Sequence, residues 1–266
     1  MKKVIILIFV FILSSGYVWA ITGKEVIEKQ KEKHKVKTEV ATEIMLLVDK
    51  DGSKEKRQLK RYAKEVAPDI HRYLLVFTAP ADIRGTALLT WEHKDRENDQ
   101  WLYMPAIKKL QRIAKSSKKN YFMGTDFTYE DLEPEDIDNF KYTILREEKF
   151  KHEKKLWDCY IIEAVPATKK KERESGYSKR IMWITKKDLL TLKVEFYNKR
   201  GKLIKVQTNY SFKEVKPGVF RPTKSFMNNI ERKHKTLIGT QKRYIDIKLD
   251  NSVFTERYIL TGKYLQ

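Results

Sequence analysis

The sequence has a single cysteine, Cys159, among 266 residues, so no disulfide can form within the chain. The stability of the protein must therefore come from a packed core. A reactive thiol needs an accessible, electropositive setting, whereas the surrounding residues, LWDCYIIEA (156–164), are typical of a strand interior. We expect Cys159 to have a structural role.

Sequence signatures of metal sites, cofactor sites and common enzymes are also missing. None of the histidines is spaced from another histidine or from the cysteine as metal ligands are; they are His34, His71, His93, His152 and His234. There is no G-x-S-x-G elbow, no phosphate-binding G-x-x-x-x-G-K-S/T loop and no dinucleotide fingerprint. We therefore expect no metal, no cofactor and no enzymatic activity.

The apolar run at the N-terminus, Val4 to Leu13, is too short to span a bilayer. It follows MKK and precedes small and polar residues, which is the layout of a secretory signal, and VWA predicts cleavage after Ala20. Residues 1–20 are thus expected to be a signal peptide and residues 21–266 the mature protein. Tyr17 stands where a lipoprotein would need a cysteine, so we expect a soluble, untethered chain; a single N-terminal anchor is the alternative.

Lysine and arginine, 56 residues, outnumber aspartate and glutamate, 36 residues, which gives a formal charge of +20. Removal of residues 1–20, including Lys2 and Lys3, leaves 246 residues and a charge of +18. An exported chain rarely meets nucleic acid. The expected anionic partners are phospholipid or lipopolysaccharide head groups and acidic envelope proteins. The alternative is that the lysines only keep the surface solvated.

The mature sequence predicts one helix followed by many strands. Thr22 and Glu25 form a capping-box pattern at the start of a helix over about 24–33. Beyond it, apolar and polar residues alternate between turns, as in half-buried strands. The expected strands are 36–48, 54–66, 70–79, 86–93, 100–104, 109–114, 139–149, 155–165, 177–185, 190–197, 202–213, 219–230 and 236–249. So large a sheet must curl into a barrel or half-barrel.

Two further patterns concern the organisation of the chain. The charged run KKKERESG (169–176) is expected to be a solvated hairpin loop. We find no internal repeat, no long linker and no low-complexity segment, which favours a single domain over residues 21–266.

Three acids offer the best case for catalysis, since paired carboxylates perform acid and base chemistry in glycosidases: Asp126, Glu130 and Asp131. A structural explanation requires less. Thr128 and Asp131 have the spacing of a capping box, and Phe127 and Leu132 that of a hydrophobic staple. We therefore favour a helix cap and keep an envelope hydrolase as a distant alternative.

Large apolar side chains are concentrated in DQWLYMPAIKKLQRIAKSS (99–117) and FMGTDFTYEDL (122–132). WLYM has apolar residues on both faces of a strand, so neither face is freely exposed to water. Pro105 then ends pairing at a sheet edge or bend. Composition alone allows two interpretations, ordinary core packing or the mouth of an apolar cavity.

Residues 90–132, TWEHKDRENDQWLYMPAIKKLQRIAKSSKKNYFMGTDFTYEDL, closely resemble the signature of the outer-membrane lipoprotein-sorting proteins, distant relatives of the periplasmic carrier LolA. FTAPADIRGTALLTW (77–91) also fits this family. The resemblance implies a mainly β, single-domain, incomplete antiparallel β-barrel of the LolA/LolB type. A few short helices would cover its concave face, over an apolar cavity for acyl chains.

This resemblance leads us to expect a periplasmic carrier of lipid or lipoprotein, closed by a lid made of the helix 24–33 and the segment 121–133. Family members often accompany inner-membrane transporters of the resistance-nodulation-division type, which are possible partners. A non-carrying accessory of such a transporter is the second interpretation. The residues expected to contact acyl chains or to guard the opening are Trp101, Tyr103, Phe122, Met123, Phe127 and Tyr129.

Overall fold

The computed structural model describes residues 20–262 and 264 of the chain. Of the predicted signal peptide, only Ala20 falls within this part. Thirteen strands form one antiparallel sheet in the order β6-β5-β4-β3-β2-β1-β13-β12-β11-β10-β9-β8-β7. The strands are β1 Thr38–Val48, β2 Lys54–Ala67, β3 Ile70–Ala79, β4 Ala87–Trp91, β5 Asp99–Met104, β6 Lys109–Arg112, β7 Phe140–His152, β8 Lys155–Pro166, β9 Lys179–Thr185, β10 Thr191–Tyr197, β11 Leu203–Lys216, β12 Val219–Asn229 and β13 His234–Ile245.

The helices are short. The described residues contain the α-helices α1 Gly23–Lys33, α2 Lys169–Glu174 and α3 Glu256–Leu260. Single 3-10 turns are η1 Pro105–Ile107, η2 Lys115–Ser117, η3 Glu130–Leu132, η4 Ile137–Asn139 and η5 Asn251–Phe254. The predicted strands and the predicted first helix are thus confirmed to within a few residues, because period-two alternation marks strands directly.

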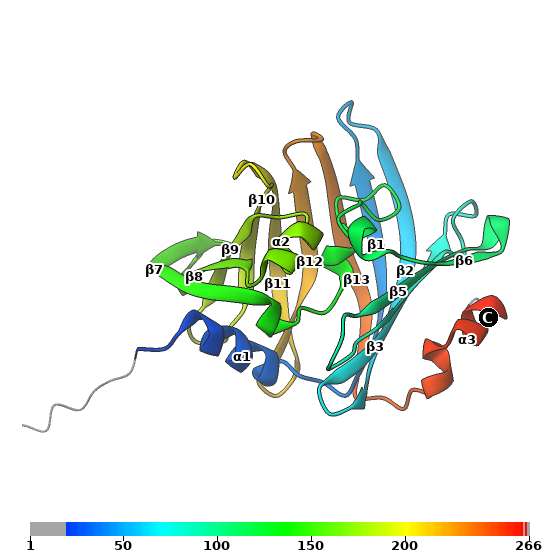
Figure 1. The fold of residues 1–266 in the computed structure, drawn as a ribbon, viewed down its shortest axis with the longest axis horizontal. Coiled ribbons are helices and arrows are strands. Elements are labelled where there is room, and N and C mark those ends of the chain that lie inside the picture. The colour runs from blue at the N-terminus through cyan, green and yellow to red at the C-terminus, as the bar shows by residue number, and fades with distance from the viewer. Residues whose placement is uncertain (1–19, 263, 265–266) are drawn as a thin grey trace, which may run out of the picture.

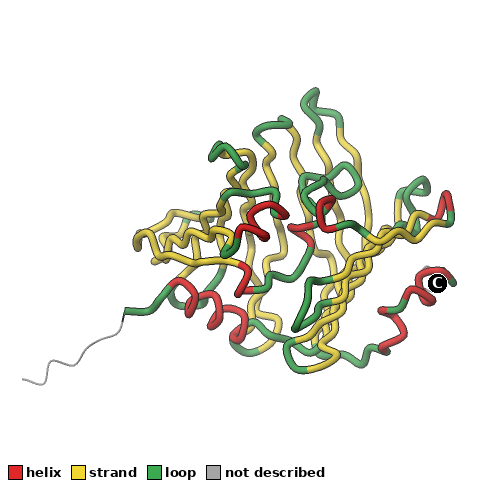
Figure 2. Tube along the Cα trace, viewed as in Figure 1, coloured by secondary structure: helices red, strands yellow, loops and turns green. Residues whose placement is uncertain are grey.

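The sheet is bent but not closed, since its edge strands β6 and β7 do not pair with each other. Its centre is the seam where β1 pairs with the last strand, β13, with Leu46 opposite Leu237. Helices α1 and α2 and the connection between β6 and β7 lie across one side of the curved sheet (Figures 1 and 2). We call this side the concave face. The expectation of an incomplete antiparallel barrel with short helices over its concave face is confirmed.

Both faces of the sheet are packed, and successive residues of a strand alternate between them. On β3, Leu75 and Phe77 belong to the main core on the concave face, whereas Leu74 and Val76 belong to a second core on the outer face. The C-terminal segment covers that second core: the Trp91 Nε1–H donates to the Phe254 carbonyl at 2.9 Å. Burial on both faces explains why the strands have so many apolar residues on either side.

Helix α1 begins as the sequence predicts. The Glu25 N–H donates to Thr22 Oγ1 at 3.2 Å and the Thr22 N–H donates to Glu25 Oε2 at 2.7 Å, which completes the capping box. Gly23 permits a close approach to β7, because a Cβ there would lie 2.8 Å from the Tyr142 carbonyl carbon. Val26 and Ile27 are then buried in the main core.

One local expectation is wrong. The run 169–176 is not wholly a loop, because its first residues form α2. Thr168 caps this helix by accepting a hydrogen bond from the Lys171 N–H at 3.1 Å. The cap allows a run of charged residues with good helix propensity to form a turn and a half of helix on the surface.

The lone cysteine is fully buried in a third apolar cluster formed by β8, β9 and their neighbours. Burial raises the pKa of the Cys159 thiol to about 11, with Glu148 and Asp158 adding to the shift. The thiol is therefore protonated at neutral pH, as expected for a structural cysteine.

Replacing a fully buried core residue should lower the protein's stability markedly. Leu59 on β2 has no exposed surface and packs in the main core. Leu59→Ala should lower the free energy of unfolding by about 2–5 kcal/mol, through lost burial and the cavity left behind. Leu156→Ala, the same change at a leucine of β8 that is 61% exposed, is the matched control. Urea denaturation should show a much smaller loss for the control.

Candidate functional site

The lid segment, residues 121–133, crosses the concave face and is folded back on itself. The Phe122 N–H donates to the Phe127 carbonyl at 2.8 Å, and Tyr121 and Thr128 form a β-bridge. Met123 and Gly124 adopt positive φ, 47° and 77°, at the tip of this turn. The ring of Phe122 stacks on Phe77 with centroids 5.7 Å apart, so the turn is pinned to β3.

Asp126 is the first anchor of the lid segment, and its side chain is fully buried. Its Oδ2 accepts from the Thr236 hydroxyl at 2.8 Å and lies 2.6 Å from His234 Nδ1, both on β13. The Asp126 N–H also donates to Thr236 Oγ1 at 3.0 Å. Arg232 lies 3.5 Å away and donates to the Thr125 carbonyl at 3.0 Å. The carboxylate thus binds the lid segment to the end of β13.

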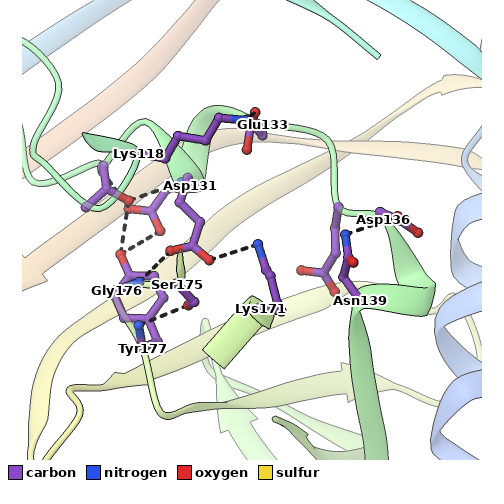
Figure 3. A network of polar contacts seen from close by, with 12 residues as sticks. Lys118, Asp131, Glu133, Asp136, Asn139, Lys171, Ser175, Gly176 and Tyr177 are labelled. Carbon is purple, nitrogen blue, oxygen red and sulfur yellow. Dashed lines mark hydrogen bonds and ion pairs between the residues drawn. The ribbon is translucent and has the colours of Figure 1, made fainter. Parts of the chain in front are cut away.

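Asp131 is the second anchor. It forms an ion pair with Lys205 of β11, whose side chain has no exposed surface. The Tyr177 hydroxyl donates to Asp131 Oδ1 at 2.9 Å (Figure 3). The reciprocal bonds of the predicted capping box are present too, since the Thr128 N–H donates to Asp131 Oδ2 at 2.7 Å and the Asp131 N–H to Thr128 Oγ1 at 3.1 Å.

The third acid, Glu130, points toward the neighbourhood of α2. Its Oε2 accepts from the Gly176 N–H at 2.8 Å, and its Oε1 lies 3.3 Å from Lys171 Nζ. All three acids considered for catalysis therefore bind groups of the protein itself. Their arrangement is that of anchors between the lid segment, β11, β13 and α2.

Two polar residues of β5, Gln100 and Asp99, lie next to the lid segment or support the strand beneath it. The Gln100 side chain donates to the Tyr129 carbonyl at 3.1 Å. Next to it, Asp99 is buried and binds Arg96, Arg112 and His93. Burial alone raises the pKa of Asp99, but these hydrogen bonds outweigh burial and hold it well below its usual value. Gln100 therefore holds residues 121–133 from β5, and Asp99 holds the residues on either side of that strand.

The six residues expected to contact lipid lie in two places. Phe122, Phe127 and Tyr129 are buried in the main core beneath the lid segment, with Met123 packed against them. Trp101 and Tyr103 belong to the outer core, where the ring centroids of Trp101 and Trp91 are 4.9 Å apart. The structure thus brings four of the six together and places two on the other side of the sheet.

Connected cavities lie between the lid, α1 and the concave face. Two adjoining cavities of about 300 and 240 Å³ form what we call the central hollow. The residues that line both of them are Glu43, Arg61, Leu132, Pro222 and Arg243. Of the six predicted residues, Phe127 lines this hollow.

A third cavity, of about 520 Å³, lies beneath α1, and we call it the helix-side hollow. Its apolar lining includes Ile27, Val36, Ile137, Met182 and Val194. It joins the central hollow through residues that line both: Glu39, Ala63, Tyr73, Gln207, Asn209 and Arg221. The cavities therefore adjoin one another along the concave face. The walls of the helix-side hollow are mostly apolar, whereas those of the central hollow are mixed.

The floor of the central hollow is charged, which the sequence did not lead us to expect. Glu39 lies between two arginines, 3.0 Å from Arg221 Nε and 2.8 Å from Arg243 Nε. Glu43 lies 3.7 Å from Arg61 Nη1. On β1, these acids alternate with outward-facing residues in a regular strand pattern. The only sign of the charged floor in the sequence was therefore a charged residue at positions of β1 where a core strand is usually apolar.

Two negative findings concern other site classes. Within the part of the chain that the structure describes, no three His, Cys, Asp or Glu side chains are grouped to hold a metal ion. In residues 20–262 and 264, no helix is long and apolar enough to cross a membrane.

A further hollow, of about 460 Å³, lies on the surface and is lined almost entirely by polar and charged residues. Lys118 and Glu133, which form an ion pair, lie beside it (Figure 3).

The buried pair between Lys205 and Asp131 should be essential to the lid. Lys205→Met should lower the free energy of unfolding by roughly 3–5 kcal/mol, because it leaves the Asp131 carboxylate buried without its cation. The control, Lys186→Met, breaks a partly exposed pair with Glu147 and should change the free energy of unfolding by about 1 kcal/mol or less. Chemical denaturation measures both. Equal effects at the two sites would contradict the anchor.

Asp99 should make stability depend on acid pH. Because its pKa is lower in the folded chain, its contribution is complete above the unfolded pKa, about 4, and is lost as pH falls below that value. The Asp99→Asn variant should therefore be less stable than wild type at pH 7, and the difference should shrink toward pH 2. Urea denaturation between pH 2 and 7 gives the two curves, and parallel curves would rule out this linkage.

Comparison with known proteins agrees with this architecture. A family model described as "-like: Uncharacterized protein" matches residues 69–261, and no curated protein sequence matches. A domain described as an outer membrane lipoprotein-sorting protein domain, from Vibrio parahaemolyticus, is 30% identical with a TM-score of 0.82, over 90% of this chain and 98% of that chain.

Two other solved structures are similar. A DUF1329 family protein from Desulfovibrio piger is 26% identical with a TM-score of 0.81, over 89% of this chain and 97% of its own. A LolA superfamily protein from Nitrosomonas europaea shares the fold, with a TM-score of 0.69 at 20% identity, over 90% and 100% of the two chains. The chain therefore belongs to the family of outer-membrane lipoprotein-sorting proteins, which have the fold of the LolA superfamily.

Proposed function

We propose that this protein is a carrier that shelters the acyl chains of a lipid or lipoprotein and transfers them between envelope membranes or to and from a transporter. The observation that supports this function is the set of adjoining hollows between the concave face, α1 and the lid segment. The volumes of its cavities fall in the range of small-molecule sites, about 300–1,000 Å³, or just below it.

The energetics of such a carrier require no nucleotide. Each methylene moved from water into an apolar site contributes about 0.8 kcal/mol. A single long chain in the helix-side hollow would therefore offset much of the cost of leaving a bilayer. Handover would follow a gradient of affinity from the donor membrane to the acceptor.

The lid of this carrier consists of α1 and the lid segment. Phe127 lines the central hollow and Ile27 the helix-side hollow, so these two side chains would contact an acyl chain. Phe122, Met123 and Tyr129 would hold the lid segment in place from the adjoining core. Trp101 and Tyr103 would support the strand that carries Gln100, the residue that binds the lid segment from β5.

The site of action of such a carrier is the periplasm. The support for this comes from the N-terminal pattern, whose predicted cleavage site at Ala20 precedes α1, and from the family to which the chain belongs. One domain, residues 21–266, would perform the whole function, since a single sheet contains every described strand.

The partners we propose are an anionic membrane surface and an inner-membrane transporter of the resistance-nodulation-division type. The formal charge of +18 that remains after residues 1–20 are removed supports the first partner, because lysine and arginine side chains attract anionic head groups. The second partner is supported by the resemblance of residues 77–132 to family members that accompany such transporters.

Native mass spectrometry of the protein, purified gently from the cell envelope, tests carriage most directly. We expect a lipid or lipoprotein mass in a substantial fraction of molecules. Purified protein that has no lipid, and takes none from vesicles, would contradict carriage and favour a non-carrying accessory of a transporter.

A variant that fills the space should separate carriage from folding. Ala63 lies where the two hollows join, so Ala63→Trp should reduce lipid occupancy several-fold while leaving circular dichroism unchanged. Ala106→Trp, the same change at an exposed residue of η1, should leave occupancy at the wild-type level. Equal occupancy in both variants would show that lipid binds elsewhere.

A further inference from the structure

The charged side chains on the floor of the central hollow differ in how completely they are bonded. Arg221 and Arg243 share Glu39, and both donate from their Nη atoms to protein oxygens, although Arg243 Nε lies 2.8 Å from Glu39 without forming a hydrogen bond. Arg221 Nη2 donates to the His34 carbonyl at 2.8 Å and Arg243 Nη1 to the Pro222 carbonyl at 3.2 Å. These two arginines therefore tie strands β1, β12 and β13 together and have a structural role.

Glu43 and Arg61 are different. The Glu43 residue is 3% exposed, its Oε1 receives one long hydrogen bond of 3.4 Å from Thr240, and its Oε2 receives none from the described residues. The side chain of Arg61 is 42% exposed, forms no hydrogen bond to any described residue, and has its Nη1 3.7 Å from Glu43 Oε2. A buried carboxylate oxygen without a donor is costly, so the hollow is suited to a ligand that supplies one.

We infer, on the basis of the proposed carrier function, that the central hollow binds the zwitterionic head group of a phospholipid, with the phosphate at Arg61 and a primary ammonium at Glu43. A guanidinium matches phosphate geometry through paired N–H donors. A primary ammonium supplies three N–H donors, which Glu43 can accept. An amine-bearing phosphodiester presents both groups on one short linker.

The charge balance favours a zwitterion over a purely anionic head group. Glu39, Glu43, Arg61, Arg221 and Arg243 together have one excess positive charge, but Glu43 repels any anion that approaches Arg61. Burial lowers the pKa of Arg243, and the nearby charges of Arg221 and Arg61 lower it further. Glu39 and Glu43 raise this pKa, but the net shift is downward. The part of the floor around Arg243 and Glu43 is therefore poorly hydrated, and unmatched charge is expensive there.

The position of the two hollows orients the lipid. Ala63 and Tyr73 line the junction, so a head group at Glu43 and Arg61 has its acyl chains directed toward the apolar walls beneath α1. Leu132 and Phe127 of the lid segment close the other side of the central hollow. The lid would thus cover the head group and α1 would cover the chains.

The test uses the delipidated full mature chain and mixed vesicles that contain equal amounts of phosphatidylethanolamine, phosphatidylglycerol and phosphatidylcholine. Native mass spectrometry measures which lipid is taken up. Wild type should prefer phosphatidylethanolamine by about tenfold, since one charge-assisted hydrogen bond contributes that much. Phosphatidylcholine, whose quaternary ammonium has no N–H, should bind less, and this comparison needs no variant.

Two variants assign the groups. Glu43→Gln, which is nearly isosteric, should lose the preference for phosphatidylethanolamine while still binding lipid, and Arg61→Met should lower uptake of all three. Glu147→Gln and Arg146→Met, both on the exposed part of β7, are matched controls and should behave as wild type. Thermal denaturation confirms that each variant is folded.

The outcomes separate the two proposals. Equal uptake of the three lipids by wild type, or an unchanged preference in Glu43→Gln, overturns the head-group site and leaves the carrier intact. No uptake of any lipid overturns the carrier itself. Free phosphoethanolamine that binds as tightly as the lipid would overturn the assignment to a lipid, because the hollow would then be a small-molecule site.

Discussion

The attachment of the lid segment to the concave face is the constraint on which the rest of the structure depends. Asp126 and Asp131 are buried carboxylates that reach β13 and β11, and each would be strongly unfavourable without its partners. Because both acids lie on one short segment, they fix its height above the sheet. A segment anchored at these two points crosses the curved face without filling the space beside it, and the hollows lie there.

The same constraint explains why the sheet can leave space unfilled. Side chains normally pack to near-crystalline density, and a bent sheet alone would close on itself or on a helix. Here the outer face has its own core beneath α3 and η5, so the strands are stabilised from the far side. The concave face is then free to combine packed regions, such as the stack of Phe77 and Phe122, with a hollow whose floor is charged.

Much of the fold could be predicted from the sequence, but the lining of the hollow could not. Alternation identified the strands, and the capping pattern at Thr22 identified the start of α1. The capping pattern at Thr128 has its hydrogen bonds but precedes only the 3-10 turn η3. Which face a residue occupies depends on register, however. A register shift on β13, opposite Thr42 and Glu43, pairs Thr42 with Lys242 and Glu43 with Thr240, which turns Arg243 rather than Lys242 toward the concave face. No local pattern marks such a bulge, so the charged floor, and the outward placement of Trp101 and Tyr103, emerge only from the pairing.

The central claim is that the space beneath the lid is occupied by the chains of a guest lipid. A crystal structure of protein purified without delipidation tests it most directly. The account predicts elongated density that runs from Glu43 and Arg61 past Ala63 to the underside of α1. Lipid bound on the outer face, with the two hollows reduced to ordered water or filled by side chains, would contradict it.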